Sequence, residues 1–133
     1  AQIQDKNITL TWKTDDDVFI AGNEHLLTRL LSNLIGNAYR YGKNNGYIFV
    51  ELSESPEQVV LSVKDNGIGI SSEDQKNIFQ RFYRADKSRA SKGTGIGLAM
   101  VNEIAELHKG TISVNSILGE GSTFLFIISK SPH

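Results

Sequence analysis

Apolar and polar residues alternate near the start of the chain. Ile8, Leu10 and Trp12 alternate with threonine and lysine, the period of two expected of a half-buried strand. The aspartates at 15–17 follow and predict a solvated hairpin turn, which is favoured over a metal site for so short an acidic run. The next apolar residues, 18–21, predict a second short strand that completes the hairpin.

The period becomes helical after this strand. Gly22-Asn23 predicts a helix start with Asn23 as the N-cap, and Gly42 predicts its end. Apolar residues recur on one face of this segment, at Leu27, Leu30, Leu31, Leu34 and Ala38. The spacing therefore predicts one long amphipathic helix packed on a core.

The remaining elements alternate without a regular strand–helix–strand rhythm. The pattern predicts strands at 47–53, 58–64, 111–116 and 123–129, a short helix at 72–79, and a helix at 97–108. The last helix has Leu98, Val101, Ile104 and Ala105 facing inward, and Lys109-Gly110 is its predicted end. This order predicts an α+β fold, a two-layer sandwich with helices on one face of a mixed, largely antiparallel sheet.

Length and composition limit the alternatives. The 133 residues predict one domain spanning 1–133, and the absence of cysteine excludes disulfides and thiolate metal sites. The 14 basic and 15 acidic residues leave a net charge of −1, which argues against a nucleic-acid partner or direct contact with an anionic membrane. No apolar run reaches the roughly 20 residues needed to span a bilayer, so we expect a soluble, monomeric piece.

The long helix carries a polar stripe beside its apolar one. Asn33, Asn37 and Tyr41 follow at intervals of four, with Arg40 close to the same line. An amide that borders the core must find a partner, and an asparagine carbonyl suits Mg²⁺. This stripe indicates a row of ligands for a polar molecule, although a solvated flank fits the helix alone equally well.

A glycine-containing segment, 65–70, follows the predicted strand at 58–64. The carboxylate of Asp65 could accept a hydrogen bond from an exocyclic amine such as that of adenine. Gly67 and Gly69 would let the backbone approach a flat ligand closely, and Ile70 ends the segment. Asp-Asn-Gly is also good turn chemistry, so a simple turn stays open here.

Residues 65–97 are rich in glycine, serine, lysine and arginine, and a loop of such length usually has a function. Within it, Phe79 and Phe82 could anchor a short helix. Tyr83, Arg84 and Lys87 place aromatic and cationic groups where they could close over a triphosphate, or form a solvated basic loop.

Three alternating glycines lead into the last helix. Backbone amides of such a loop and of the helix start bind anions, although a flexible hinge also fits. The pattern is neither a P-loop nor a dinucleotide fingerprint, because it lacks the Gly-Lys-Ser/Thr ending and does not directly follow a strand. Its residues are Gly93, Thr94, Gly95, Ile96, Gly97 and Leu98.

The order of these motifs resembles the catalytic ATP-binding domain of bacterial sensor histidine kinases. Asn33-x-x-x-Asn37, Asp65-x-Gly67-x-Gly69, Phe79-x-x-Phe82 and Gly93-x-Gly95-x-Gly97 resemble that family's N, G1, F and G2 boxes. Residues 119–124 resemble its closing G-x-G-S-x-F segment, so the resemblance covers nearly the whole chain. One departure is Lys92, where many members have a further glycine. The superfamily includes DNA gyrase, Hsp90 and MutL, and the resemblance implies their Bergerat fold, with about five strands and three helices.

The resemblance also implies roles for the site residues, with ATP and Mg²⁺ as cofactors. Asn37 would bind Mg²⁺, Asn33 and Arg40 would lie near the phosphates, and these three would be the catalytic groups. Tyr41 would pack by the nucleoside, and Asp65 would receive the adenine amine. The remaining contacts would come from Gly67, Gly69, Ile70, Tyr83, Arg84, Lys87, Gly93, Thr94, Gly95, Ile96, Gly97, Leu98 and Thr123.

The resemblance further implies transfer of the γ-phosphoryl group to a histidine. ATP-hydrolysing members have a glutamate at the position of Asn33, and an amide cannot act as that general base. His25, His108 and His133 lack the family's phosphoacceptor context, so we expect the acceptor on separate dimerisation helices and no autophosphorylation of this piece alone.

The implied partners are those helices and a downstream response regulator. The implied location is the cytoplasm, with the parent protein anchored in the cell membrane. A serine kinase of the anti-sigma-factor type and a non-catalytic nucleotide sensor stay open as alternatives.

Overall fold

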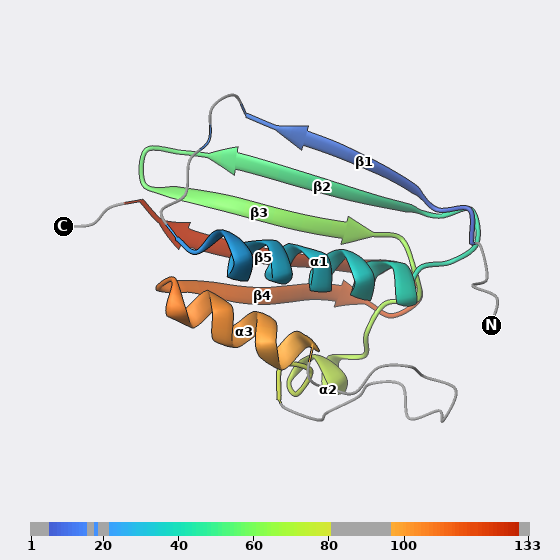
Figure 1. Cartoon of the computed structure of the whole chain (residues 1–133). Coiled ribbons are helices and arrows are strands. Elements are labelled where there is room, and N and C mark those ends of the chain that lie inside the picture. Colours follow the sequence, from blue (N-terminus) through green and yellow to red (C-terminus); the bar gives the residue numbers. More distant parts are fainter. Residues whose placement is uncertain (1–5, 16–17, 19–21, 81–96, 131–133) are drawn as a thin grey trace.

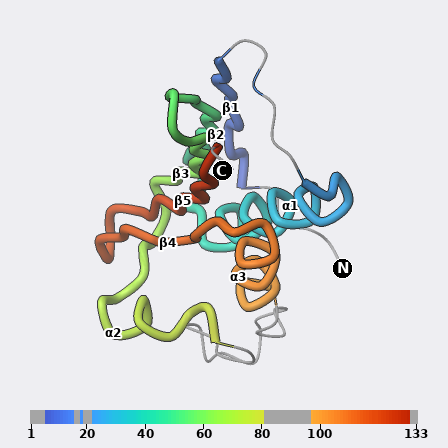
Figure 2. The backbone as a smooth tube through the Cα atoms, turned by 90° about the vertical axis from the view of Figure 1, so that its left-hand side faces the viewer, coloured from blue at the N-terminus to red at the C-terminus, as the bar shows by residue number. Residues whose placement is uncertain are grey.

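Two helices cover one face of a five-stranded sheet (Figures 1 and 2). The computed structural model describes residues 6–15, 18, 22–80 and 97–130. The strands are β1 (Thr9–Thr14), β2 (Tyr47–Glu54), β3 (Gln58–Asp65), β4 (Gly110–Ile117) and β5 (Gly121–Ser129). The helices are α1 (Glu24–Arg40), α2 (Ser72–Gln75) and α3 (Gly97–Leu107). The predicted α+β class is confirmed. The single turn of α2 lies past β4, whereas α1 and α3 form the helical layer.

The sheet has the order β1-β2-β3-β5-β4. Only the β1–β2 pair is parallel among the described strands, and the other three pairs are antiparallel. The parallel pair follows from connectivity, because α1 carries the chain back across the sheet between β1 and β2. The predicted mixed, largely antiparallel sheet is therefore confirmed. No helix in the described part of the chain is long and apolar enough to cross a bilayer.

The long helix begins and ends where its pattern predicts. The Asn23 side chain accepts a hydrogen bond of 2.9 Å from the Leu26 N–H, which confirms the predicted N-cap. Leu30, Leu34 and Ala38 are buried, so the predicted apolar stripe faces the core. At the other end the chain leaves the helix at Tyr41, immediately before the predicted stop at Gly42.

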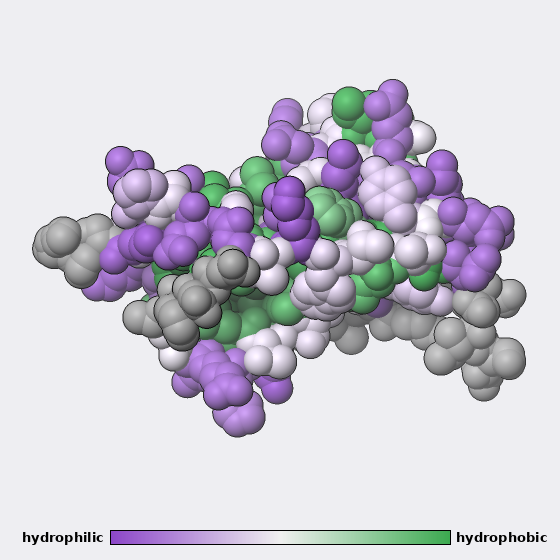
Figure 3. All heavy atoms as spheres, turned by 90° about the horizontal axis from the view of Figure 1, so that it is seen from above, coloured by the Kyte–Doolittle hydropathy of each residue, from purple (hydrophilic) through white to green (hydrophobic). Residues whose placement is uncertain are grey.

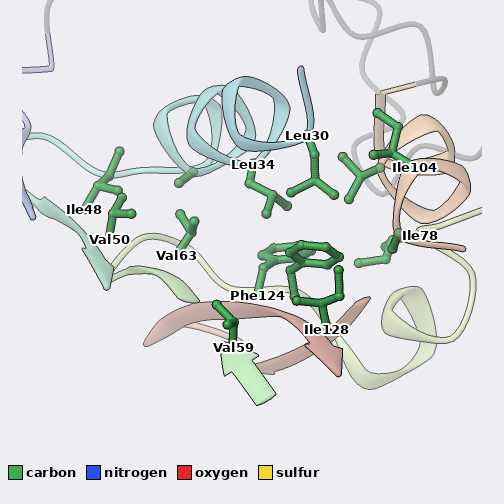
Figure 4. Close-up of a cluster of buried hydrophobic side chains, with 14 of the residues drawn as sticks. Leu30, Leu34, Ile48, Val50, Val59, Val63, Ile78, Ile104, Phe124 and Ile128 are labelled. Atoms are coloured by element: carbon green, nitrogen blue, oxygen red, sulfur yellow. The ribbon is translucent and has the colours of Figure 1, made fainter. Parts of the chain in front are cut away.

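The core lies between α1, α3 and the covered face of the sheet. In Figure 4, Leu30 and Leu34 point from α1 toward Phe124 of β5, with Ile104 of α3 nearby. The Phe79 ring packs edge-on against Phe124, at 6.1 Å between ring centroids and an interplanar angle of 89°. Phe79 thus joins the segment after α2 to the core, the anchoring function predicted for it.

The first strand differs from its prediction. Leu10 and Trp12 are 42% and 58% exposed, so β1 is not half-buried. Their strand neighbours in β2 are Ile48 and Val50, which are buried beneath α1, whereas β1 lies at the sheet edge. Apolar side chains are accordingly visible between polar ones in Figure 3, which looks down on the β1 side of the molecule.

The described residues that follow β1 also differ from the predicted hairpin. Among the described residues the partner of β1 is β2, in a parallel pair. Val18 lies outside any strand, and residues 19–21 lie outside the described part of the chain. Asp15 accepts a hydrogen bond of 2.8 Å from the Glu54 N–H, so this carboxylate binds the end of β2.

Two other element ends differ from prediction. The helix at 72–79 is shorter, since α2 ends at Gln75 and hydrogen-bonded turns continue to residue 79. At the end of α3, Lys109 takes the left-handed conformation (φ 57°), and Gly110 already belongs to β4. A Cβ on Gly110 would lie 2.6 Å from the Ile127 carbonyl oxygen, so close strand packing requires this glycine.

Two side chains hold the ends of the helical layer. Lys6 Nζ donates to the carbonyl oxygens of Tyr39, Arg40 and Gly42 at 3.1, 2.7 and 3.2 Å, and therefore caps the end of α1. The His108 ring accepts from the Asn23 N–H at 3.0 Å through Nε2, and its Nδ1 lies 2.8 Å from the Ile104 carbonyl oxygen. His108 therefore joins the end of α3 to the start of α1 and has a structural position.

Candidate functional site

Two asparagine side chains flank the apolar stripe of α1. Asn33 and Asn37 lie one turn apart, and both are half-buried. Asn33 Oδ1 faces the start of α3, since a Cβ on Gly97 would lie 3.7 Å from it. Asn33 Nδ2 makes a weak contact, 3.9 Å to the sulfur of Met100. Within the described ranges, the Asn37 side chain has no hydrogen-bond partner.

A buried carboxylate lies at the end of β3. Asp65 is 4% exposed, and one of its oxygens accepts a hydrogen bond of 2.8 Å from the Gly67 N–H. Burial raises the pKa of Asp65, because it penalises the charged form, while the backbone N–H groups of Gly67 and Ser122 act in the opposite direction. A carboxylate has about four acceptor positions, so Asp65 keeps capacity for a further donor.

The loop after Asp65 is held by the protein's own backbone. A Cβ on Gly67 would lie 2.1 Å from the Tyr41 carbonyl oxygen. Gly69 has φ +76°, and a Cβ there would lie 2.3 Å from the Ile117 carbonyl oxygen. Ile68 extends this contact in both directions, donating to Tyr41 at 3.0 Å and accepting from the Gly119 N–H at 2.7 Å. The two glycines are thus explained by internal packing, before any ligand is considered.

A cavity of about 330 Å³ opens beside this loop. It brings together three of the predicted site residues, Tyr41, Gly69 and Ile70. Its other lining residues are Ile68, Ser71, Asp74 and Leu118, which the sequence motifs did not indicate. Larger hollows of about 420 and 560 Å³ lie around the first turns of α1, away from the asparagine pair and Asp65. The chemistry of the lining therefore favours the smaller cavity.

The prediction for Thr123 is wrong in its placement. Thr123 pairs with Lys64, and Ser122 is the residue directly opposite Asp65. Side chains alternate between the two faces of a strand, so Ser122 shares the buried face with Asp65 and Phe124, and Thr123 points to the other face. Counting back two residues from the inward Phe124 would have indicated Ser122.

Hydroxyl and amide groups beneath the cavity were missed as well. The Ser116 hydroxyl of β4 lies 2.8 Å from that of Ser122 and accepts from the Ile70 N–H at 2.7 Å. The Gln75 side-chain amide donates to the Ile70 and Ser116 carbonyl oxygens at 2.8 and 3.0 Å. These contacts join residues 41 positions apart and carry no local sequence signal.

The remaining predicted residues are placed only in part. Arg40 is exposed in the last turn of α1, while Gly97 and Leu98 open α3, whose first turn has no acidic residue. A helix start of this kind favours a bound anion. The other predicted residues lie outside the described part of the chain: Tyr83, Arg84, Lys87, Gly93, Thr94, Gly95 and Ile96.

Comparison with known protein families identifies the family of this chain. A family model described as "Histidine kinase-, DNA gyrase B-, and HSP90-like ATPase" matches residues 22–132. The chain belongs to this family. The match spans the asparagine helix, the Asp65 loop and the strands β2 to β5, so it includes every described element of the site.

Related proteins agree with this membership. The chain is 44% identical over 110 residues to the sensor histidine kinase RppB of Synechocystis sp., covering 81% of this chain and 24% of that protein. The catalytic domain of histidine kinase ThkA has a similar fold, with a TM-score of 0.82, 29% identity, and coverage of 96% of this chain and 83% of that one. Full-length ShkA, solved in complex with AMPPNP, gives a TM-score of 0.81 at 28% identity over 93% of this chain and 26% of that one. The chain therefore spans about a quarter of the length of RppB.

Proposed function

We propose that this domain binds Mg²⁺–ATP and donates the γ-phosphoryl group to a histidine on a separate dimerisation domain. The observation that carries the proposal is a site whose two ends differ in their polar groups. A buried carboxylate with spare acceptor capacity lies at one end, and at the other lies the Asn37 amide of α1, which no side chain or backbone group of the described residues binds. A nucleotide has a matching polarity, with an amine-bearing base at one end and metal-bound phosphates at the other.

The base would occupy the cavity beside the Asp65 loop. Its volume of about 330 Å³ and its mixture of Tyr41, Ile70 and backbone atoms suit a flat heteroaromatic ring. Asp65 would accept a hydrogen from the exocyclic amine of adenine. A buried carboxyl with a raised pKa gains from a ligand donor, because such a donor stabilises its charged form.

The residues on α1 fit a magnesium ion bound together with phosphates. Mg²⁺ prefers hard oxygen ligands and keeps several waters, so one amide oxygen with substrate phosphates is an ordinary coordination set. Asn37 would supply that oxygen, and Asn33 would lie between it and the start of α3. Arg40 and the α3 amides would neutralise phosphate charge, which is the main contribution of protein groups to phosphoryl transfer.

The residue types favour transfer over hydrolysis. Asn33 occupies the position where ATP-hydrolysing members have a glutamate base, and an amide cannot accept a proton from water. The domain would therefore position the γ-phosphoryl group, and the histidine that accepts this group would lie in another part of the protein. ShkA was solved with the ATP analogue AMPPNP, and a solved structure of ThkA contains a response regulator, TrrA.

We infer that the partners are the dimerisation helices of the parent kinase and a response regulator. The chain would act as one catalytic module, 1–133, of a longer cytoplasmic signalling region in a membrane-anchored kinase. The length of its relatives supports this, since the match covers only 24% of RppB.

Calorimetry tests the site. Asn37→Ala should abolish Mg²⁺-dependent ATP binding while the domain stays folded. Asp65→Asn should weaken ATP binding by about 1–3 kcal/mol, a loss of about fivefold to 150-fold. Asn44→Ala serves as the matched control, since Asn44 is exposed between α1 and β2. Unchanged affinity in both site variants would disprove the assignment.

Incubation with a cognate dimerisation helix pair and labelled ATP tests the reaction. We expect label on the helix pair that is lost in acid, as phosphohistidine is, and none on this chain alone. Acid-stable label would indicate a serine kinase instead, and no transfer to any cognate pair would indicate a nucleotide sensor.

A further inference from the structure

The Ser116 hydroxyl lies between Ile70, which lines the cavity, and Ser122, which pairs with Asp65. It is half-buried near the end of β4, on the face of the sheet that carries the core. One side of the cavity is the Ile70 backbone, which donates its N–H to Ser116 Oγ at 2.7 Å. A second contact is Ser122, the β5 residue opposite Asp65, whose hydroxyl is 2.8 Å from Ser116 Oγ. One oxygen atom thus joins a residue that lines the cavity to the strand neighbour of Asp65.

Counting hydrogens assigns the direction of these bonds. Ser116 has one hydroxyl hydrogen, which it donates to the Gly121 carbonyl oxygen at 2.9 Å. It accepts from Ile70, so the short contact with Ser122 requires the Ser122 hydroxyl to be the donor. The Ser122 oxygen then presents only lone pairs toward the Asp65 side of the pocket. Ser116 therefore fixes which hydrogen-bonding groups this end of the cavity offers.

Gln75 holds the same wall from α2. Its amide nitrogen has two hydrogens, and both are used, one for the Ile70 carbonyl and one for the Ser116 carbonyl. The N–H and the C=O of Ile70 are thus both held by these two side chains. Ile70 is 5% exposed and lines the cavity, so its backbone position sets the width of the slot for a flat ring.

We propose that Ser116 is a positioning residue for nucleobase selectivity, joining the Ile70 wall to the Asp65 side of the pocket, with Gln75 as its second support. This rests on the proposed function, since it concerns the same cavity. Ser116 acts through its neighbours and does not itself touch the base. Its loss would leave Ser122 free to turn its hydroxyl hydrogen toward the ligand side and would release one end of the wall.

The test compares two nucleotides on the whole chain. ATP carries the exocyclic amine that would donate a hydrogen bond to Asp65, and purine riboside triphosphate lacks this amine. Ser116→Ala should reduce the preference for ATP over the amine-free nucleotide by about fivefold to tenfold, the size expected for one misplaced hydrogen bond. Ser113→Ala is the matched control, because Ser113 lies on the same strand with its side chain exposed on the other face. The control should leave the ratio unchanged.

A purely structural function predicts a different result. In that case Ser116→Ala would lower the melting temperature and weaken the binding of both nucleotides equally. An unchanged ratio of the two affinities would therefore overturn the proposal. Ser116→Thr keeps the hydroxyl and should retain the ratio. Should Ser116→Ala not fold, Gln75→Leu tests the same wall with Ser116 in place, against Gln80→Leu as the exposed control.

The outcomes also separate this inference from the proposed function. An unaltered chain that binds neither nucleotide would disprove both. An unaltered chain that prefers ATP, with variants that keep the full preference, would disprove the positioning function of Ser116 alone.

Discussion

The carboxyl of Asp65 is buried, and the backbone N–H groups of Gly67 and Ser122 offset only part of the cost of burying its charged form. Its burial is useful for recognition, because a desolvated acceptor discriminates strongly between ligands with and without a donor. The same burial raises its pKa and penalises the ligand-free fold in its charged form. This residue therefore links nucleotide recognition to a pH dependence of stability.

We expect Asp65→Asn to be more stable than the unaltered chain at neutral pH, although it binds ATP more weakly. The folded pKa lies above the ordinary value of 3.8, so the folded state binds the proton more tightly than the unfolded state. Stability of the unaltered chain then falls as pH rises from 3.8 through the folded pKa. Denaturant titrations across this interval should show the advantage of the variant shrinking as the pH falls. A constant difference at all pH values would contradict the explanation.

Gly36 lies in the middle of α1, on its exposed side, and nothing lies within 4 Å of a Cβ placed there. Glycine in a helix interior costs about 1 kcal/mol relative to alanine. Gly36→Ala should therefore raise the free energy of unfolding by about 1 kcal/mol. Gly67→Ala is the contrast, because its Cβ would lie 2.1 Å from the Tyr41 carbonyl oxygen, and it should destabilise. Urea denaturation of both variants measures the two effects.

At the scale of single residues, the sequence predicts some residues of the candidate site and not others. Asp65 could be selected because it follows a strand and precedes turn residues. Thr123 was chosen in place of Ser122 because the motif alone does not say which of two adjacent hydroxyls faces inward. Ser116 and Gln75 could not be selected at all, since their contacts depend on how β4 and α2 lie against the loop.

At the scale of elements, the end of α1 depends on a side chain distant in the sequence. Lys6 Nζ donates to three carbonyl oxygens at the end of the helix and lies 5.6 Å from the centre of the Tyr39 ring. These carbonyls flank Tyr41, which lines the cavity. The cap therefore stabilises the part of α1 that the proposed site uses.

We expect Lys6→Met to lower the free energy of unfolding by about 1 kcal/mol, through loss of a cation at a helix C-terminus and of its hydrogen bonds. Methionine keeps most of the aliphatic chain over Tyr39. Lys13→Met on β1 is the control, because Lys13 is exposed. Equal stability of both variants would show that the cap is not significant.

Element types were predictable and some of their ends were not. The period of apolar residues predicts α1, α3 and all five strands. The left-handed residue after α3 is Lys109, although glycine is the usual choice, because Gly110 is required for packing against β5. Burial of β1 could not be predicted, since alternation does not show whether a helix covers the strand.

At the scale of the whole molecule, ligand binding should appear as stabilisation. A ligand present at one hundred times its Kd stabilises the folded state by about 2.7 kcal/mol. For a domain of this size that corresponds to a rise in Tm on the order of 8 °C. We expect Mg²⁺–ATP to produce this rise in the unaltered chain and none in Asn37→Ala. Equal rises in both would contradict the function assigned to Asn37.

The position of β1 also determines which strand would detach first under a pulling force. The pairs among β2, β3, β5 and β4 are all antiparallel neighbours, and none of them requires β1. Tension applied at the start of the chain would load Lys6 and β1 before any other strand. Detachment of that strand would remove the Lys6 amine from the end of α1, next to Tyr41. A pull on the start of the chain would thus act on the proposed nucleotide pocket mechanically, through the end of α1.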